Sequence, residues 1–294
     1  MRIANVAGRA TLLDTDGGGL DVAKASGGRL PSDPQALFEH WDALRDWAAQ
    51  TGGSGGDFAV DATQLGAPAP TPRQVFAIGL NYAEHAAESR IARPDTPPVF
   101  TKFPTSITGP RAQVVLPSAH VDWEVELVVA IGRTAVGVAE SAAWDHVAGL
   151  TVGQDLSERM VQLSGPVPQF SLGKSYPGFA PLGPALVAPD EFADPDDLEL
   201  GCRIGDEVLQ QGRTRDMIFG VAELIARLSA VCPLLPGDII FTGTPSGVGM
   251  ARDPQRYLQP GTTLVSHVVG IGELRNTMVA GPVPASGETS GPRD

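Results

Sequence analysis

Residues 122–132 constrain the fold of this chain more than any other segment. Side chains alternate between the two faces of a β-strand, and on one face every residue from Trp123 to Ile131 is apolar. The opposite face begins with three carboxylates and continues with two apolar residues: Asp122, Glu124, Glu126, Val128 and Ala130. The stretch therefore predicts a strand that is buried on both sides and carries acidic groups at its entrance.

Three carboxylates at the entrance of such a strand have two interpretations. Like charges this close repel and raise one another's pKa unless a cation neutralises them, and a hard divalent cation prefers oxygen ligands of this kind. Alternatively, the first residues of the strand protrude into water, where acidic side chains need no partner. The stretch by itself leaves both interpretations open.

The composition is typical of a soluble globular protein. The chain has 294 residues, of which 42% are hydrophobic and 19% charged, enough for one large domain and a small one. The formal net charge of −13 opposes nucleic acid or an anionic membrane as a partner. A local site can still attract a small anionic substrate against this global charge.

Targeting and cysteine signals are weak. The N-terminal residues lack the long apolar core of a signal peptide, and no run is long enough to span a bilayer. Cys202 and Cys232 lie far apart without a Cys-x-x-Cys spacing, so we expect two buried free thiols. These features predict a cytoplasmic protein.

Residues 1–70 are expected to form a small N-terminal domain. Short strands are predicted at residues 2–6 and 10–13, followed by a helix over residues 34–50 that Ser32 caps. A flexible connector is expected over residues 51–56, and a stiffer, Pro-rich boundary follows at residues 66–72.

Residues 72–280 contain most of the predicted strands. The strands are expected over residues 74–78, 123–131, 185–188, 201–204, 238–242 and 263–269, and helices over residues 141–147 and 216–231. This pattern favours a mixed, β-rich α+β fold with a mostly β second domain rather than alternating β-α units. The Gly-, Pro- and Ser-rich tail at residues 281–294 is expected to be disordered.

Asp155 follows the largely apolar run of residues 147–152. At the end of a buried strand it is a candidate third oxygen ligand for a cation near Glu124 and Glu126, leaving positions for water and substrate. The alternative is that Asp155 caps a turn.

His85 and Glu88 are three residues apart, so on a helical turn they face the same way. A carboxylate beside an imidazole orients it and raises its basicity, as in a general base for water. The alternative is a solvated helix face with incidental charges.

Lys174 lies between apolar and small residues and is a candidate for neutralising an enolate or a carboxylate; otherwise it is a loop lysine without a chemical role. Residues 236–249 predict a turn, a buried strand and a Gly-rich loop, whose N–H groups and Thr hydroxyls suit a substrate carboxylate. No Gly-Lys-Ser or Gly-Lys-Thr follows, which argues against a nucleotide P-loop.

Taken together, these segments resemble the fumarylacetoacetate hydrolase family over about residues 72–280. The matching motifs occur in the family's order: residues 79–82 with His85 and Glu88, residues 98–102, 122–127 and 155–159 with Gln162, and residues 173–175, 181–184, 210–219 and 236–249. The N-terminal unit is shorter than the barrel-like domain of the animal fumarylacetoacetases, so fumarylacetoacetate itself is not the expected substrate.

The resemblance implies that a β-roll catalytic domain follows the small N-terminal domain in the chain, and that the protein is a homodimer, as is usual in the family. It implies Mg²⁺ or Mn²⁺ held by Glu124, Glu126 and Asp155, with Asp122 in a supporting or strand-entry role. By the same likeness His85, Glu88 and Lys174 are catalytic and Arg159, Gln162 and Thr244 bind the substrate.

The expected reaction is hydrolysis of a C–C bond in an acylpyruvate-like 2,4-dioxo acid. The alternative is isomerisation, tautomerisation or decarboxylation of an unsaturated 2-oxo dicarboxylate, as by a 2-hydroxyhepta-2,4-diene-1,7-dioate isomerase. A catalytically silent metal-binding or interaction protein is a third interpretation. The choice of the small anionic 2-oxo acid is expected to depend on residues 90–98, 161–169 and 250–257.

Overall fold

The computed structural model describes residues 1–14, 16–51, 56–88 and 92–281. Most of the connector expected at residues 51–56 and nearly all of the tail expected at residues 281–294 lie outside these residues, as does the start of the segment 90–98. Among the described residues, no helix combines the length and apolar character needed to cross a membrane.

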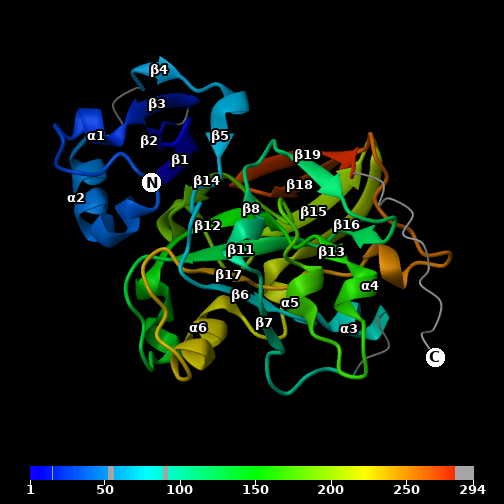
Figure 1. The fold of residues 1–294 in the computed structure, drawn as a ribbon. Helices are drawn as coiled ribbons and strands as arrows, with labels where there is room; N and C mark the ends of the chain where they lie inside the picture. The colour runs from blue at the N-terminus through cyan, green and yellow to red at the C-terminus, as the bar shows by residue number, and fades with distance from the viewer. Residues whose placement is uncertain (15, 52–55, 89–91, 282–294) are drawn as a thin grey trace, which may run out of the picture.

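A large mixed sheet runs through the molecule (Figure 1) in the order β4-β3-β2-β1-β14-β12-β11-β17-β6-β7, with β5 paired to β1 and β8 to β14. Its strands are β1 (Arg2–Val6), β2 (Arg9–Leu13), β3 (Gly18–Asp21), β4 (Phe58–Ala59), β5 (Leu65–Gly66), β6 (Val75–Ile78), β7 (Val99–Thr101), β8 (Ile107–Thr108), β11 (Val125–Ile131), β12 (Val147–Gln154), β14 (Ala180–Val187) and β17 (Ile239–Phe241).

A second sheet has the order β16-β15-β18-β19-β9, and β10 pairs with β13. These strands are β9 (Gln113–Leu116), β10 (Val121–Asp122), β13 (Ser157–Glu158), β15 (Glu199–Ile204), β16 (Glu207–Arg213), β18 (Thr263–Val268) and β19 (Gly272–Ala280). The α-helices are short: α1 (Val22–Ala25), α2 (Trp41–Thr51), α3 (Ala83–Glu88), α4 (Arg159–Gln162), α5 (Phe170–Gly173) and α6 (Val221–Ser229). The mixed, β-rich α+β fold predicted from the sequence is confirmed.

Strand β11 lies between two cores, and all of its residues are buried. The apolar face from Trp123 to Ile131 packs in a core with the second sheet and α6. The opposite face, through Val128 and Ala130, packs in another core with α2 and β17. The sequence therefore predicted both faces correctly, although the strand starts at Val125, two residues later than expected.

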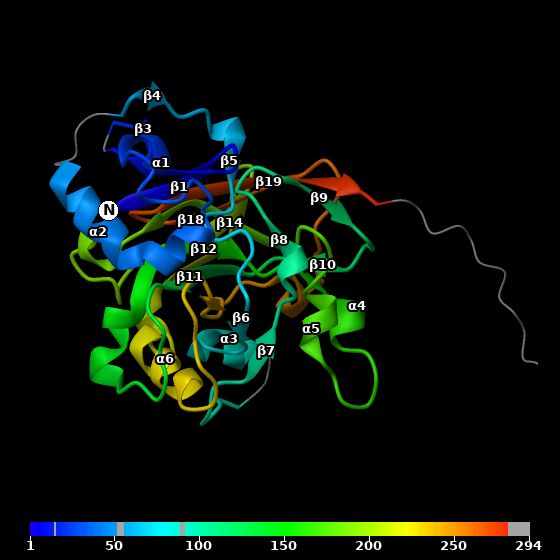
Figure 2. The ribbon, with the colours of Figure 1, turned by 60° about the vertical axis from the view of Figure 1, so that its left-hand side comes forward.

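The segment of residues 1–70 is joined to the rest of the molecule through the large sheet. Strand β1 pairs with β14, with Arg2 opposite Val187 and Ile3 opposite Leu186. Trp41 and Leu44 of α2 belong to the same core as Ile239 and the Val128–Ala130 face of β11. In Figures 1 and 2 this segment lies at one end of the molecule, beyond β14.

Three predicted helices differ from the observed ones. The stretch 34–50 is a 3₁₀ turn, η1 (Ala36–His40), followed by α2, and Asp33 rather than Ser32 accepts the N–H groups of Gln35 and Ala36. A carboxylate next to Pro34 reaches these N–H groups more directly than a hydroxyl one residue earlier. The helix expected at residues 141–147 is the 3₁₀ segment η4 (Glu140–His146), and the chain enters β12 at Val147.

The helix expected at residues 216–231 begins only at Val221. The preceding residues are η6 (Thr214–Asp216) and a stretch held by Asn81, whose carbonyl accepts from Ile218 N–H at 2.7 Å and whose side-chain oxygen accepts from Phe219 N–H at 2.8 Å. Asn81 Nδ2 also donates to the Phe219 carbonyl at 3.0 Å, so this carbonyl is not available to accept a helical bond. The remaining 3₁₀ segments are η2 (Ala62–Gln64), η3 (Pro104–Ser106), η5 (Pro189–Glu191) and η7 (Gly249–Ala251).

Both cysteines are free, as expected, but only one is fully buried. Cys202 lies inside the second sheet, whereas Cys232 is partly exposed after α6.

Candidate active site

A cavity of about 570 Å³ opens where β11, α3, α4, α5 and the loop after β17 meet. Most of the predicted site residues line it: His85, Glu88, Glu124, Arg159, Gln162, Lys174 and Thr244. Glu126 and Asp155 do not line the cavity, although one carboxylate oxygen of each lies within 4.8 Å of a Glu124 oxygen. The structure thus brings together residues that are distant in the chain. Gly247 N–H, for example, bonds Glu88 across 159 positions.

Directly behind the cavity lining lies a cluster of three buried carboxylates, called the floor below, and of these three only Glu124 lines the cavity itself. Glu124, Glu126 and Asp155 each offer one oxygen, and these oxygens lie within 4.8 Å of one another. The antiparallel register of β11 and β12 produces this arrangement, because Val125 pairs with Gln154 and Asp155 N–H bonds the Glu124 carbonyl at 2.9 Å. The three residues predicted from the sequence are therefore neighbours in space.

Lys174 neutralises part of this cluster. Its Nζ lies 2.9 Å from Glu124 Oε2 and 2.6 Å from Asp155 Oδ2, and it also donates to Ser157. Burial by itself would raise the pKa of Glu124, but the charges of Lys174 and Arg159 outweigh burial and lower that pKa to about 2. Burial likewise tends to lower the pKa of Lys174, and Asp155 and Glu124 more than offset it.

Glu126 lacks such a partner. Its Oε2 accepts from Gly243 N–H at 2.7 Å, and among the described residues it forms no ion pair. Burial raises the pKa of Glu126 well above its usual value, and the negative charges of Asp155 and Glu124 raise it further. An oxygen-only donor set with one uncompensated carboxylate fits a hard divalent cation.

Lys102 is a part of the site to which sequence reasoning assigned no role. It is fully buried, and its Nζ lies 2.6 Å from Asp155 Oδ1 and also donates to the Lys174 carbonyl. Burial lowers the pKa of Lys102, and the Asp155 carboxylate opposes that effect. The available signal was the position of Lys102 at the end of a matching motif, directly after β7.

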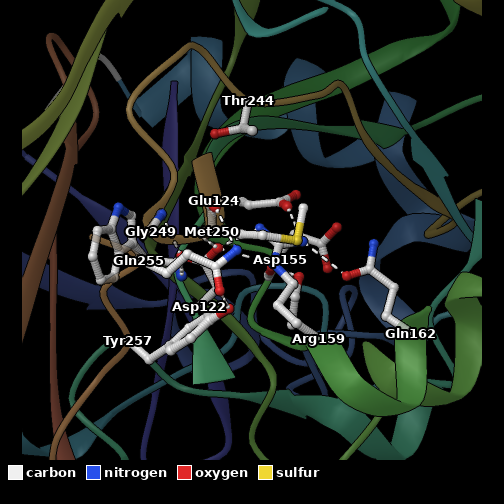
Figure 3. A network of polar contacts seen from close by, with 12 residues as sticks. Asp122, Glu124, Asp155, Arg159, Gln162, Thr244, Gly249, Met250, Gln255 and Tyr257 are labelled. Carbon is white, nitrogen blue, oxygen red and sulfur yellow. Dashed lines mark hydrogen bonds and ion pairs between the residues drawn. The ribbon is translucent and has the colours of Figure 1, made fainter. Parts of the chain in front are cut away.

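Asp122 anchors Arg159 next to the floor (Figure 3). Its Oδ2 accepts from Arg159 Nε at 2.9 Å and Nη2 at 2.7 Å. The same carboxylate accepts the N–H groups of Trp123, Gly249 and Met250, at 2.8, 2.7 and 2.9 Å. Asp122 therefore joins the guanidinium to the cavity-lining loop after β17.

Arg159 presents its other edge to the cavity. Its Nη1 lies 2.7 Å from Glu124 Oε1 and donates to Gln162 Oε1 at 2.8 Å. Figure 3 shows Arg159 between Asp122 and Gln162, beside Glu124. Burial would lower the pKa of Arg159, but Asp122 and Glu124 outweigh it, so the guanidinium keeps its charge at the edge of the floor.

His85 and Glu88 form a pair on α3. Nδ1 of His85 lies 2.7 Å from Oε1 of Glu88, as the i, i+3 spacing predicted. The second Glu88 oxygen accepts from Gly247 N–H at 2.9 Å, which holds the carboxylate in place. Because the carboxylate accepts the Nδ1 proton, the imidazole keeps Nε2 free as an acceptor.

Thr244 lines the cavity, but its hydroxyl is already engaged. Oγ1 donates to the Val125 carbonyl at 2.8 Å and accepts from Gln210 Nε2 at 2.8 Å. A hydroxyl has a single hydrogen to donate. In this structure the Thr244 side chain therefore fastens the loop after β17 to strand β11.

Comparison with known proteins agrees with this geometry. The model of the fumarylacetoacetate (FAA) hydrolase C-terminal family matches residues 74–279. Human mitochondrial oxaloacetate tautomerase FAHD2A is 43% identical over 215 residues, which cover 72% of this chain and 68% of that protein.

Two solved structures extend the likeness to the fold. A Mycobacterium smegmatis protein described as HpcE has a TM-score of 0.90 and 53% identity, and the match covers 96% of this chain and 100% of that one. Maleylpyruvate hydrolase from Sphingobium sp. SYK-6, solved with manganese(II) and pyruvate, has a TM-score of 0.77 and 29% identity, covering 96% of this chain and 100% of that one.

Proposed function

This chain belongs to the fumarylacetoacetate hydrolase family, and from that premise we propose that it is a divalent-metal-dependent hydrolase of a C–C bond in an acylpyruvate-like 2,4-dioxo acid. The observation that carries the proposal is the His85–Glu88 pair, which lines the same cavity as Glu124 and Lys174. A base for water and a site for an anionic intermediate are the two requirements of hydrolytic C–C cleavage.

The cofactor of the proposal is Mg²⁺ or Mn²⁺, held by Glu124, Glu126 and Asp155. When bound, the cation supplies Lewis-acid polarisation of the 2-oxo group and stabilisation of the enolate charge. The oxygen-only donor set and the missing counter-charge of Glu126 support it, as does the manganese(II) in the maleylpyruvate hydrolase structure.

His85 activates the water. Glu88 Oε1 accepts the Nδ1 proton, so Nε2 of His85 takes a proton from a water molecule as its oxygen adds to the distal carbonyl carbon. Glu88 Oε1, 2.7 Å from Nδ1, then accepts a charge-assisted hydrogen bond from the imidazolium that forms.

Lys174 and Arg159 stabilise the pyruvate-type fragment. When the C–C bond breaks, its electron pair stays on the pyruvate-type fragment as an enolate, and the distal fragment leaves as a carboxylic acid. The Lys174 ammonium, kept charged by Asp155 and Glu124, lies beside this charge. Arg159, Gln162 and the Thr244 loop hold the substrate carboxylate, and His85 returns its proton to the enolate carbon.

The experiment is pyruvate release from acetylpyruvate with Mn²⁺ or Mg²⁺ supplied, for the wild type and His85→Ala. The variant is expected to lose about 10²- to 10⁴-fold in kcat, the usual contribution of a positioned base. His40→Ala, at an exposed histidine on η1, is the matched control and should keep full activity. A wild type that releases pyruvate from no acylpyruvate with either metal would contradict the proposal.

A second candidate is tautomerisation or isomerisation of a 2-oxo dicarboxylate, and the name of the human relative favours it. Proton transfer between carbon and oxygen needs a base and a site for an enolate, but no water. Ketonisation of enol-oxaloacetate, followed by its ultraviolet absorbance, distinguishes the candidates. A wild type that ketonises enol-oxaloacetate without hydrolysing acetylpyruvate, and a His85→Ala variant that retains this ketonisation, would favour the second reaction.

A further inference from the structure

We propose that one wall of the cavity, formed by Phe100, Leu163 and Phe170, is a subsite for a hydrocarbon tail of the substrate. The tail would extend from a 2-oxo acid head bound at the acidic floor. This inference rests on the proposed function, because it names the class of substrate that the same site accepts.

The three side chains come from neighbouring elements and form one surface. Phe100 lies in β7, Leu163 follows α4, and Phe170 begins α5. The rings of Phe100 and Phe170 meet edge to face with 5.7 Å between their centroids. Helices α4 and α5 lie side by side in both views of the fold, with β7 against α5 (Figures 1 and 2).

This surface is left open to the cavity. Leu163 is 44% exposed, and both phenylalanines are only partly buried although they line the cavity. Apolar side chains that line a concave site beside a few convergent polar groups are the common arrangement for binding the apolar part of a small molecule. Covering them with hydrocarbon is favourable because it removes apolar area from water.

The wall adjoins the chemistry directly. Nζ of Lys174 lies 5.1 Å from the centroid of the Phe100 ring and also contacts Glu124 and Asp155. A 2-oxo acid head held at Lys174 and Glu124 therefore places its first tail carbons beside Phe100. From there Phe170 and Leu163 continue the apolar surface.

The size of the cavity agrees with a substrate larger than a four-carbon diacid. Its volume of about 570 Å³ falls within the roughly 300–1,000 Å³ of pockets that hold drug-sized ligands. A competing class is a dicarboxylate, since Arg252 also lines the cavity. Arg252 donates to the Leu209 carbonyl at 2.9 Å and lies over the Trp123 ring, but its buried Nε has no hydrogen-bond partner among the described residues. The binding test therefore compares the two substrate classes directly.

The test measures binding, so it does not depend on turnover. Dissociation constants of 2-oxobutanoate, 2-oxohexanoate and 2-oxooctanoate are measured by calorimetry on the full chain with Mn²⁺. The affinity is expected to rise about fourfold per methylene, and 2-oxohexanoate should bind more tightly than 2-oxoadipate, which has the same length but ends in a carboxylate.

Two variants and two matched controls locate the effect. Leu163→Ser and Phe170→Ala are expected to flatten the rise with chain length while leaving the affinity for 2-oxobutanoate within about twofold of wild type. Leu172→Ser and Phe103→Ala replace exposed residues of the same types that do not line the cavity, and should keep the wild-type slope.

An affinity that does not change with chain length, tighter binding of 2-oxoadipate, or equal losses in the control variants would overturn the proposal. The outcomes separate it from the proposed reaction. A rise in affinity without hydrolysis of any acylpyruvate contradicts the reaction and leaves the subsite standing. Hydrolysis without any dependence on chain length contradicts the subsite alone.

Discussion

The floor of the cavity and its apolar wall are built in opposite ways. On the floor, Glu126, Asp155 and Lys174 are at most 1% exposed, and nearly every charged group has one or more partners at hydrogen-bond distance. On the wall, Leu163 is 44% exposed and contributes shape rather than polar contacts. In the proposals above the floor carries the chemistry and the wall selects the substrate, and the wall can change its side chains at little energetic cost because they are not tied by polar contacts.

The physical reason is the cost of buried charge. Moving an ion out of water costs several kcal/mol of free energy unless protein partners replace its hydration. Three ion pairs replace the lost hydration: Lys102 with Asp155, Lys174 with Glu124, and Arg159 with Asp122. Replacing any member leaves a partner uncompensated, so the floor tolerates few substitutions. Glu126, without an ion pair among the described residues, is the exception.

The largest effect is expected for Glu126→Gln. It removes a proposed ligand without changing the shape, and kcat/KM should fall by about 10³-fold, since several kcal/mol of transition-state stabilisation go with the cation. At a Mn²⁺ concentration of about 100 times Kd, the unfolding free energy of the wild-type protein should rise by about 2.7 kcal/mol, which is measured as a rise in Tm. The variant should show no rise, and its metal-free Tm should equal or exceed that of wild type, because like-charge repulsion is relieved.

Glu158→Gln is the control for this experiment. Glu158 is also buried, but it caps α4 and lies outside the acidic cluster. It should keep the Mn²⁺-dependent rise in Tm. A rise that survives in Glu126→Gln would place the cation elsewhere and break the distinction between floor and wall.

The next effect separates a buried ion pair from an exposed one. Asp122→Asn weakens the bond to Arg159, whose side chain is 4% exposed, and should cost about 3 kcal/mol of unfolding free energy. Asp42→Asn breaks the exposed pair with Arg133 and should cost less than about 1 kcal/mol. Urea unfolding measures both. KM should rise in Asp122→Asn alone, and equal losses in the two variants would contradict the anchoring of Arg159.

An effect of similar size tests the backbone under Glu126. Gly243 has φ +99, and a Cβ there would meet the Asn81 Cβ at 2.6 Å. Gly243→Ala should therefore cost about 3 kcal/mol through strain and overpacking and displace the N–H that binds Glu126. Gly261→Ala has a similar φ of +85 but meets no described atom within 4 Å, and should cost about 1 kcal/mol. Chemical unfolding of both variants, with Mn²⁺ affinity as the second readout, checks the difference.

The smallest effect is expected on the wall. Leu163→Ser should change the unfolding free energy by less than about 0.5 kcal/mol, as for other partly exposed positions. A loss comparable to that of Asp122→Asn would show that the wall is as constrained as the floor.

Much of the site followed from local sequence patterns. The period of two along residues 122–132 predicted both faces of β11, and the spacing of His85 and Glu88 predicted their contact. Such patterns are visible because neighbouring residues on a strand or helix have fixed relative directions. The helix over residues 216–231 began late because Asn81, far away in the chain, bonds its expected first turn.

The sequence by itself determined that a buried strand carries carboxylates, that a histidine has a carboxylate partner, and to which family the chain belongs. These properties depend on local geometry and on residue order. Only the tertiary structure decided which charges compensate one another. Lys102 bonds Asp155 across 53 residues, and Asp122 bonds Met250 across 128. Such partners are set by strand register and loop packing, which no local period reveals. The same packing placed Phe100, Leu163 and Phe170 on one wall beside Lys174.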